Sequence, residues 1–406
     1  MSSDSGADVP DERAGFTVGL DVAAITPTEL QPAIYLGAYG LPFTRVAEGV
    51  HDEIYVRSFA VGLDDSGIVL AVTDLPGLGN HFTRDVRARV AEATGLSEHR
   101  VLLSATHSHS SPDFQGLWGG GPASYRDVAI DRIVASMTAA WDARVPATLE
   151  VATTTAPNHN RRDWGFTDDA LTIVRAVDAR GQALGLFTVF AAHPTVLGEG
   201  NHDISRDWCG YAVDALESRT AAPALLFNGV LGDASPDVPA GDYADDFERA
   251  AAYGELVADA VLEGVTSSEP IDPELHVDHR TWTLVGTNVL FNLAAQVGLL
   301  DYDYDEAGGE LSVDTQATYL RLGTQLQIVT FPGEPLTRVG LPIKDVMQAP
   351  HRAVLGQTND MLGYFIPSDE WMTGHNDDYE ESISLGPDVG DITRDVLIAL
   401  IETDAF

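Results

Sequence analysis

Apolar segments with the length of buried strands lead directly into residues that can bind a metal ion or transfer a proton. VLLSAT precedes His107 and His109, LGLFTVFAA precedes His193, PALLFNGVLGD precedes Ser235, and QLQIVTFPG precedes Glu334. In α/β proteins, reacting groups collect at the carboxyl ends of strands, in loops that a rigid sheet holds in place. Two imidazoles and a carboxylate brought together in this way suit a catalytic zinc site, which keeps one position free for water. The arrangement predicts a soluble metal-dependent hydrolase.

Each of these residue types also has a structural interpretation. A His-x-His pair on an extended strand end points both rings to one face, which favours ligation, but such a pair is also found hydrogen-bonded within structural sites. Glu334 precedes PLTRVG and could instead complement the N-terminus of a helix that starts there. Ser235 precedes Pro236, so a turn or N-cap serine is the alternative. The residues alone leave these alternatives open.

The charge composition restricts the partners. The 406 residues include 62 Asp and Glu but only 23 Lys and Arg, which gives a formal net charge of -39, and Lys344 is the only lysine. Such a field excludes nucleic acid as a partner and disfavours anionic membrane surfaces. In molar salt the Debye length falls to roughly 3 Å, so the self-repulsion is screened. The composition predicts a protein of a high-salt cell; the alternative is an acidic protein from an ordinary one.

Other composition features indicate a cytoplasmic protein. A single cysteine, Cys209, excludes an internal disulfide and is expected to be packed structure. The N-terminal MSSDSGADVPDER has neither the positive nor the apolar region of a secretory signal. No apolar run is long enough to span a membrane. Residues 1–13 are acidic and polar, so we expect them to be disordered.

The remaining pattern alternates between strands and helices. Strands are predicted at 17–25, 55–63, 68–75 and 147–156, and again within 280–297 and 317–331; helices are predicted at 83–95, at 126–143 and after Ser235. This alternation predicts an α/β fold with a mixed β-sheet core flanked by helices. Because the candidate site residues extend from 107 to 379, a single catalytic domain is expected to span 14–406.

Blocks in a fixed order resemble a known family. ATHSHSSP, FAAHP with HDISRDWCGYA, NGVLGDASPD, FPGE and LGYFIPSDEW are similar, in this order, to the blocks of the neutral/alkaline (non-lysosomal) ceramidases, and VGLDVAAITPTE resembles the opening strand of that family. The resemblance implies a ceramidase-like catalytic domain that hydrolyses the N-acyl amide of ceramide, or of a related small amphiphile, to a fatty acid and an amine. It covers nearly the whole chain.

The resemblance also implies roles for individual residues. A Zn²⁺ ion would be held by His107, His193, Glu334 and Tyr364. His109 would move protons beside the metal, and Ser235 would lie at the reacting centre, either as a nucleophile or as a group that orients water and substrate. Arg161 and Tyr379 would polarise the scissile amide, although the adjacent Arg162 is an alternative to Arg161. His202 and Asp207 would support the ligands, whereas His276, His279 and His351 are expected to be surface or structural residues.

Several positions depart from the family pattern around the expected pocket. SSPDFQG replaces a glycine-rich run, and Pro367 and Ser368 replace a threonine pair. Because the sequence ends at Phe406, we expect a short homologue that lacks the immunoglobulin-like C-terminal domain of full-length ceramidases. These changes leave the expected ligands in place, so they bear on which substrate the pocket accepts. A different amide or ester substrate, or an inactive lipid-binding homologue, are the alternatives. The sequence does not specify the oligomeric state.

Overall fold

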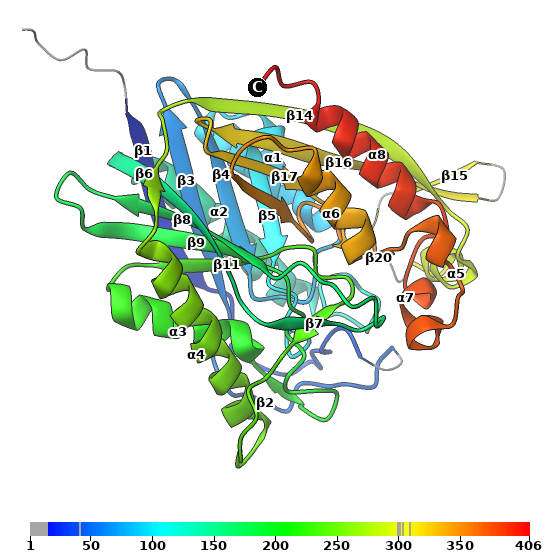
Figure 1. The fold of residues 1–406 in the computed structure, drawn as a ribbon. Coiled ribbons are helices and arrows are strands. Elements are labelled where there is room, and N and C mark those ends of the chain that lie inside the picture. The colour runs from blue at the N-terminus through cyan, green and yellow to red at the C-terminus, as the bar shows by residue number, and fades with distance from the viewer. Residues whose placement is uncertain (1–14, 40–41, 299–301, 303, 308–309) are drawn as a thin grey trace, which may run out of the picture.

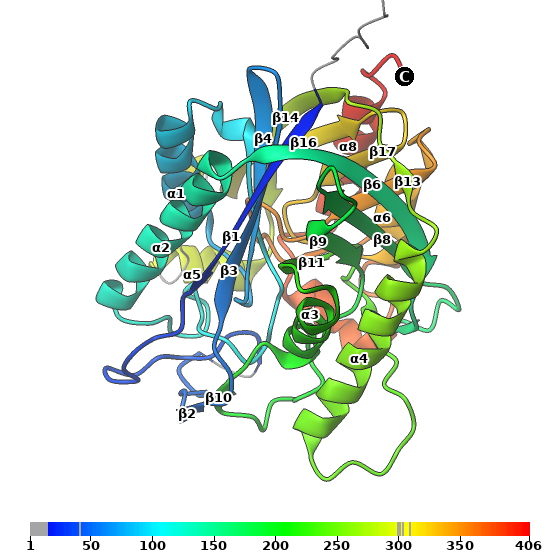
Figure 2. The same ribbon diagram turned by 90° about the vertical axis from the view of Figure 1, so that its left-hand side faces the viewer.

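The computed structural model describes residues 15–39, 42–298, 302, 304–307 and 310–406, so the segment 1–13 lies outside the described residues. A large mixed sheet and a smaller one pack face to face, and helices cover both outer surfaces (Figures 1 and 2). The predicted α/β fold with a mixed sheet flanked by helices is therefore confirmed. Its division into stacked sheets had no signal in the sequence.

The large sheet contains both parallel and antiparallel pairs. Its strand order is β11 (Ala224–Asn228), β9 (Ala183–Phe190), β8 (Ala170–Val177), β6 (Val145–Thr155), β1 (Phe16–Ala24), β3 (Tyr55–Leu63), β4 (Ser66–Thr73) and β5 (Val101–Ala105), with β13 (Glu269–Pro270) beside β6. The outermost pairs, β11 with β9 and β4 with β5, are parallel, and the pairs between them are antiparallel. The strands that precede His107 and His193 thus belong to one sheet.

The smaller sheet supplies the other half of the core. Its order is β14 (Leu275–Gly286), β16 (Glu310–Leu322), β17 (Leu326–Thr330) and β19 (His351–Leu355), with β15 (Asp305–Ala307) beside β16. Phe59, Phe187 and Phe227 of the large sheet share a buried cluster with Leu320 and Ile328 of the smaller one. Strands covered on both faces are buried along their whole length and are therefore mostly apolar, as β11 and β17 are.

Helices complete the outer layers. On the large sheet, α1 (Asn80–Thr94) and α2 (Ala123–Asp142) cover one part, and α3 (Asp207–Thr220) and α4 (Asp246–Val265) cover the other (Figure 2). On the smaller sheet lie α6 (Thr337–Asp345) and α8 (Val389–Ile401), with α5 (Val289–Gln296) and α7 (Tyr379–Ser382) near one end (Figure 1). None of the described helices is long and apolar enough to cross a membrane. Cys209 is buried in α3, as expected.

The prediction of strand structure throughout 280–297 is wrong in its second half. The strand β14 ends at Gly286, and the Asn288 side chain accepts a hydrogen bond from the Leu290 amide at 2.9 Å, which starts α5. The segment is rich in Val, Leu and Phe, and we interpreted that composition as a buried strand. Most of these side chains are in fact exposed on a helix, so burial did not produce the pattern.

Short strand pairs connect the loops at the site. The strand β18 (Glu334–Pro335) pairs with β20 (Tyr364–Phe365), β12 (Ala234–Pro236) pairs with β7 (Asn158–Asn160), and β10 (Asp203–Ile204) pairs with β2 (Gly49–Val50). Within the first pair, Glu334 lies directly opposite Tyr364. These pairs bring together segments that are far apart in the sequence.

Candidate metal centre

His107 leaves the end of β5 in a strained conformation. Its φ is 68°, a left-handed value that non-glycine residues rarely adopt and that often marks a functional site. Its amide donates to the Leu75 carbonyl at 3.0 Å, and its Nδ1 donates to the Pro76 carbonyl. Because Nδ1 is held by a backbone oxygen, Nε2 is directed away from that loop with its lone pair free.

The loop after β9 fixes His193 in a comparable way. Nδ1 of His193 donates to the Ala234 carbonyl at 3.0 Å, and the Trp208 indole donates to the His193 carbonyl at 3.1 Å. The Asp207 carboxylate accepts hydrogen bonds from the amides of residues 196 and 197, which continue the same loop. Asp207 therefore supports the loop, as we expected. His202 instead lies against the Val46 carbonyl, 3.2 Å away, and contacts none of the expected ligands.

Glu334 and Tyr364 enter from the side of the smaller sheet. Oε2 of Glu334 lies 2.9 Å from Nε2 of His193 and 3.5 Å from Nε2 of His107. The Tyr364 hydroxyl lies 3.3 Å from Nε2 of His193. The preceding Gly363 has φ of 79°, and a Cβ there would stand 2.0 Å from the Ile383 carbonyl oxygen, so only glycine fits. The structure thus brings together the four ligands that the resemblance implies.

His193 has an oxygen acceptor beside each of its ring nitrogens. Both ring nitrogens of His193 face an oxygen acceptor, the Ala234 carbonyl on one side and Glu334 on the other. A neutral imidazole carries only one N–H. Burial, reinforced by the nearby Arg161, lowers the pKa of His193 to about 4, so the ring is neutral at pH 7. The lone pairs of Nε2 and Oε2 therefore face each other at 2.9 Å, an arrangement that a cation between them would stabilise.

His109 belongs to the same buried group. Its Nε2 lies 3.1 Å from Nε2 of His107, and one ring nitrogen from each of His107, His109 and His193 lies within 4.8 Å of the others. Within the described part of the chain, Nδ1 of His109 is buried and has no hydrogen-bond partner. Burial and the neighbouring His107 hold the pKa of His109 well below its ordinary value. The group of rings fits a divalent metal ion with nitrogen and oxygen ligands.

The structure separates the adjacent arginines. Nη2 of Arg161 donates to the Gly232 carbonyl at 2.6 Å and lies 3.5 Å from the Tyr364 hydroxyl, beside the expected ligands. Arg162 is fully buried and points elsewhere, forming ion pairs with Glu380 and Glu381. Of the two alternatives, Arg161 is therefore the one that reaches the site.

Tyr379 and Ser235 lie next to the site but make different contacts. The Tyr379 ring lies 6.1 Å from the Tyr364 ring, centre to centre, and lines the same cavity. Ser235 directly follows Ala234, whose carbonyl holds His193, and it pairs with His159 in the short β12–β7 ladder. Its predicted role at the reacting centre remains a prediction.

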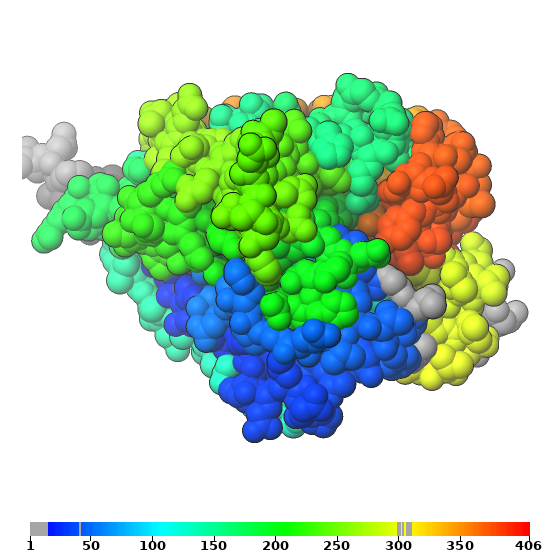
Figure 3. All heavy atoms as spheres, turned by 90° about the horizontal axis from the view of Figure 1, so that it is seen from below, coloured from blue at the N-terminus to red at the C-terminus, as the bar shows by residue number. Residues whose placement is uncertain are grey.

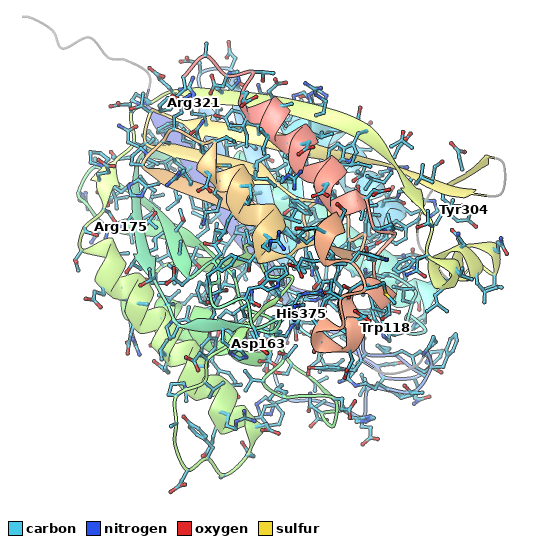
Figure 4. The ribbon with its side chains drawn as sticks, turned by 45° about the vertical axis from the view of Figure 1, so that its right-hand side comes forward. Trp118, Asp163, Arg175, Tyr304, Arg321 and His375 are labelled. Carbon is cyan, nitrogen blue, oxygen red and sulfur yellow. The ribbon has the colours of Figure 1, made fainter. Side chains whose placement is uncertain are left out.

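A small cavity opens onto these groups. Its polar end includes His107, His109, Glu334 and Tyr364. The remaining wall is largely apolar, with Leu117, Trp118 (labelled in Figure 4), Phe291, Met361 and Ile383. The cavity therefore has a polar end at the histidines and a largely apolar wall.

Some site residues were missed in the sequence. The Tyr39 ring packs edge-to-face on His109, with centres 4.7 Å apart, and Arg45 donates to the His109 carbonyl at 2.9 Å. Glu380, which is fully buried, accepts from both arginines. None of the three follows a strand-like run, so the rule that located the histidines gave no signal for them.

Comparison with known proteins agrees with this geometry. Residues 16–252 match the family model described as neutral/alkaline non-lysosomal ceramidase, N-terminal. The chain is 29% identical over 263 residues to the neutral ceramidase of Mycobacterium tuberculosis, covering 55% of this chain and 40% of that protein. It is 26% identical over 265 residues to the neutral ceramidase of Drosophila melanogaster, covering 55% and 36%. The matches thus span well under half of these curated relatives.

The fold is also similar to that of solved structures. The crystal structure of the neutral ceramidase from Pseudomonas aeruginosa superposes with a TM-score of 0.81 at 19% identity, over 96% of this chain and 74% of that one. A structure titled as a ceramidase complexed with C2 gives 0.78 at 18% identity, over 96% and 75%. At this identity the likeness concerns the fold, which extends beyond the segment that the family model matches. The chain belongs to the neutral/alkaline non-lysosomal ceramidase family.

Proposed function

We propose that this protein is a zinc-dependent amidohydrolase that cleaves the N-acyl amide of ceramide or of a related lipid, giving a fatty acid and an amine. The observation that carries the proposal is the buried cluster of His107, His193 and Glu334, whose nitrogen and oxygen donors lie close enough together to hold a cation. This cluster lies at the polar end of a cavity with an apolar wall. Membership of the ceramidase family supports the same chemistry.

His107, His193, Glu334 and Tyr364 are the residues that would hold the metal. Neutral imidazoles and a carboxylate are the ligands that zinc prefers among nitrogen and oxygen donors. Zn²⁺ bound there would supply Lewis-acid polarisation of the amide carbonyl and a water acidic enough to react near neutral pH. Tyr364 is the weakest donor of the set, because burial and the Glu334 carboxylate raise the pKa of its phenol well above the ordinary value.

His109 is the residue placed to move the proton. Since its pKa is held low, the ring is a neutral base at pH 7, with Nε2 facing the cluster. It would take a proton from the attacking water and return it to the leaving amine nitrogen. Tyr39 against the ring and Arg45 on the His109 carbonyl keep the imidazole in position for both transfers.

Arg161 and Tyr379 would stabilise the developing oxyanion. Arg161 is oriented by the Gly232 carbonyl and Glu380, and Tyr379 lines the cavity beside Tyr364. Donors fixed before the reaction stabilise charge that develops in the transition state. Ser235 would either attack the carbonyl or orient water and substrate.

The first test is metal content by mass spectrometry together with hydrolysis of a fluorogenic N-acyl-sphingosine, both in molar KCl. We expect about one zinc per chain, removed by chelators and absent from His193→Ala. A matched control is His276→Ala, since that ring lies edge-to-face against Tyr319 and outside the cluster. Zinc without turnover would redirect the search to other amides or esters. A parent protein without metal would overturn the proposal.

A further inference from the structure

The outer face of α5 is apolar and uncovered. Val289, Leu290, Leu293 and Val297 are 76%, 62%, 55% and 60% exposed, respectively. Residues 281–298 contain no charged side chain, in a chain of which 21% of residues are charged. Figure 3 shows the atoms of this region at the edge of the molecule, next to the orange atoms of the α7 segment. Scattered exposed apolar residues are ordinary, but a cluster of them on one helix marks a contact surface.

The inner face of the same helix is part of the candidate site. Phe291 lines the cavity that contains His107, Glu334 and Tyr364. It also lines a second, small cavity, whose wall is apolar apart from the hydroxyls of Tyr302 and Tyr304 (Tyr304 is labelled in Figure 4). A single helix turn therefore separates solvent-exposed aliphatic side chains from the wall of the pocket.

The helix is anchored to the α7 segment and is not a loose flap. Nδ2 of Asn288 donates to the Ser384 carbonyl at 2.7 Å and to the Ser382 carbonyl at 3.1 Å, while the amides of residues 287 and 288 donate to the Leu385 carbonyl. The segment that carries Tyr379 and Ile383 is thus tied to α5. The helix and this segment are therefore held together, and both contribute side chains to the wall of the pocket.

Charge decides between the possible occupants of this surface. At ionic strengths below molar, where the charge is only partly screened, the net charge of -39 repels anionic membranes and acidic partners, including a second copy of this chain. An uncharged or zwitterionic lipid surface is not repelled, and the aliphatic side chains of α5 gain free energy when they leave water for it. The absence of charge from 281–298 also means that no ion has to be desolvated there.

We propose that α5 inserts its exposed apolar face into the surface of an uncharged or zwitterionic lipid aggregate, so that the amphiphilic substrate passes from the aggregate along Phe291 into the pocket. This inference rests on the proposed function for the identity of the substrate, but not for the binding itself. Val289, Leu290, Leu293 and Val297 form the inserting surface.

The experiment is flotation of the full chain with phosphatidylcholine vesicles, and with vesicles that also contain phosphatidylserine, in buffered salt. Parent protein is compared with Leu290→Glu/Leu293→Glu and with Val128→Glu, a control on α2 that is 46% exposed and lines neither cavity. We expect binding to phosphatidylcholine, weakened by phosphatidylserine and lowered about tenfold or more in the double variant, because each inserted side chain then carries a charge. The control should bind as the parent does. Circular dichroism and the unfolding midpoint establish that each variant is folded.

Different outcomes bear on different parts of the inference. A parent that does not float with phosphatidylcholine, or a double variant that floats as well as the parent, overturns the inserting surface. A parent that is dimeric by light scattering, becomes monomeric in the double variant and does not float would assign the face to a second copy and also overturn it. A parent that floats but hydrolyses no N-acyl amide would refute the proposed function and leave the lipid-binding surface supported.

Discussion

Replacement of Arg162 by methionine is expected to destabilise the fold by about 3–5 kcal/mol, because one partner of a buried ion pair is removed. Arg162 is fully buried between Glu380 at 3.2 Å and Glu381 at 3.0 Å, and both carboxylates are almost completely excluded from water. Methionine fills much of the volume of the arginine stem. The lost stability therefore reports the cost of burying the Glu380 and Glu381 carboxylates without the Arg162 cation. They must then either stay charged or take up protons.

The same replacement at Arg161 is expected to cost little stability but much turnover. Its side chain is 20% exposed, so water can replace part of what is lost, and we expect a stability change of about 1 kcal/mol. Its Nη2 lies beside Tyr364 at the candidate metal centre. If it stabilises an oxyanion, turnover should fall by about 100- to 1,000-fold, as for the loss of one such donor.

Urea unfolding in molar KCl, followed by tryptophan fluorescence, measures both variants, with the slope checked to be unchanged. A second signature is the pH dependence of Arg162→Met. Burial already raises the pKa of Glu380, and the loss of the cation raises it further. The folded state then binds more protons than the unfolded state, so the variant should regain stability as the pH is lowered toward 5. Adding Glu381→Gln should restore part of the loss at pH 7.

The reasoning would be refuted if Arg162→Met unfolded within about 1 kcal/mol of the parent, since no buried pair of this kind is that weak when broken. It would also be refuted if Arg161→Met were the less stable of the two. Equal loss of turnover in both variants, with both folded, would mean that Arg161 has no special role at the site.

Three further predictions follow from other parts of the structure. Ser235→Ala should lose turnover and keep its zinc; a metal-free variant would instead show that the serine positions the loop around His193. Burial raises the pKa of Asp360 to about 7, so stability should fall as the pH rises from about 4 to 7, by up to about 4 kcal/mol, and Asp360→Asn should flatten that slope in urea titrations. Transfer from molar to millimolar salt should lower the thermal midpoint, because the net charge of -39 is then unscreened; an unchanged midpoint would contradict the high-salt interpretation.

The strand ends could be predicted because they depend on local sequence. A run of apolar residues followed by a histidine or carboxylate locates both the strand and the candidate ligand, and the structure places His107, His193 and Glu334 together. The partners that orient them could not be predicted in this way. The Pro76 and Ala234 carbonyls are backbone groups of distant loops, and any residue type at those positions would offer the same oxygen.

Errors occurred where side-chain type and burial disagree. The segment of α5 has the composition of a strand but exposes its apolar residues, so periodicity and composition gave the wrong element. Glu380 and Glu381 are of a residue type usually found at the surface, yet both are buried. The arginine that they bind is more than 200 positions away in the sequence. Long-range pairing of this kind leaves no trace in a single sequence.

The origin of the ligands in separate sheets has a consequence for the biosynthesis of the protein. His193 and Glu334 are 141 residues apart, and the strand β18 that carries Glu334 pairs with β20, which is made later still. At ordinary translation rates the ribosome needs about 10–30 s to cover that distance. During this interval the histidine side of the centre exists without its carboxylate. If the proposed metal binds there, its four-ligand site would be complete only late in synthesis, and the metal content of the purified protein would report how many chains have assembled both sides of the centre.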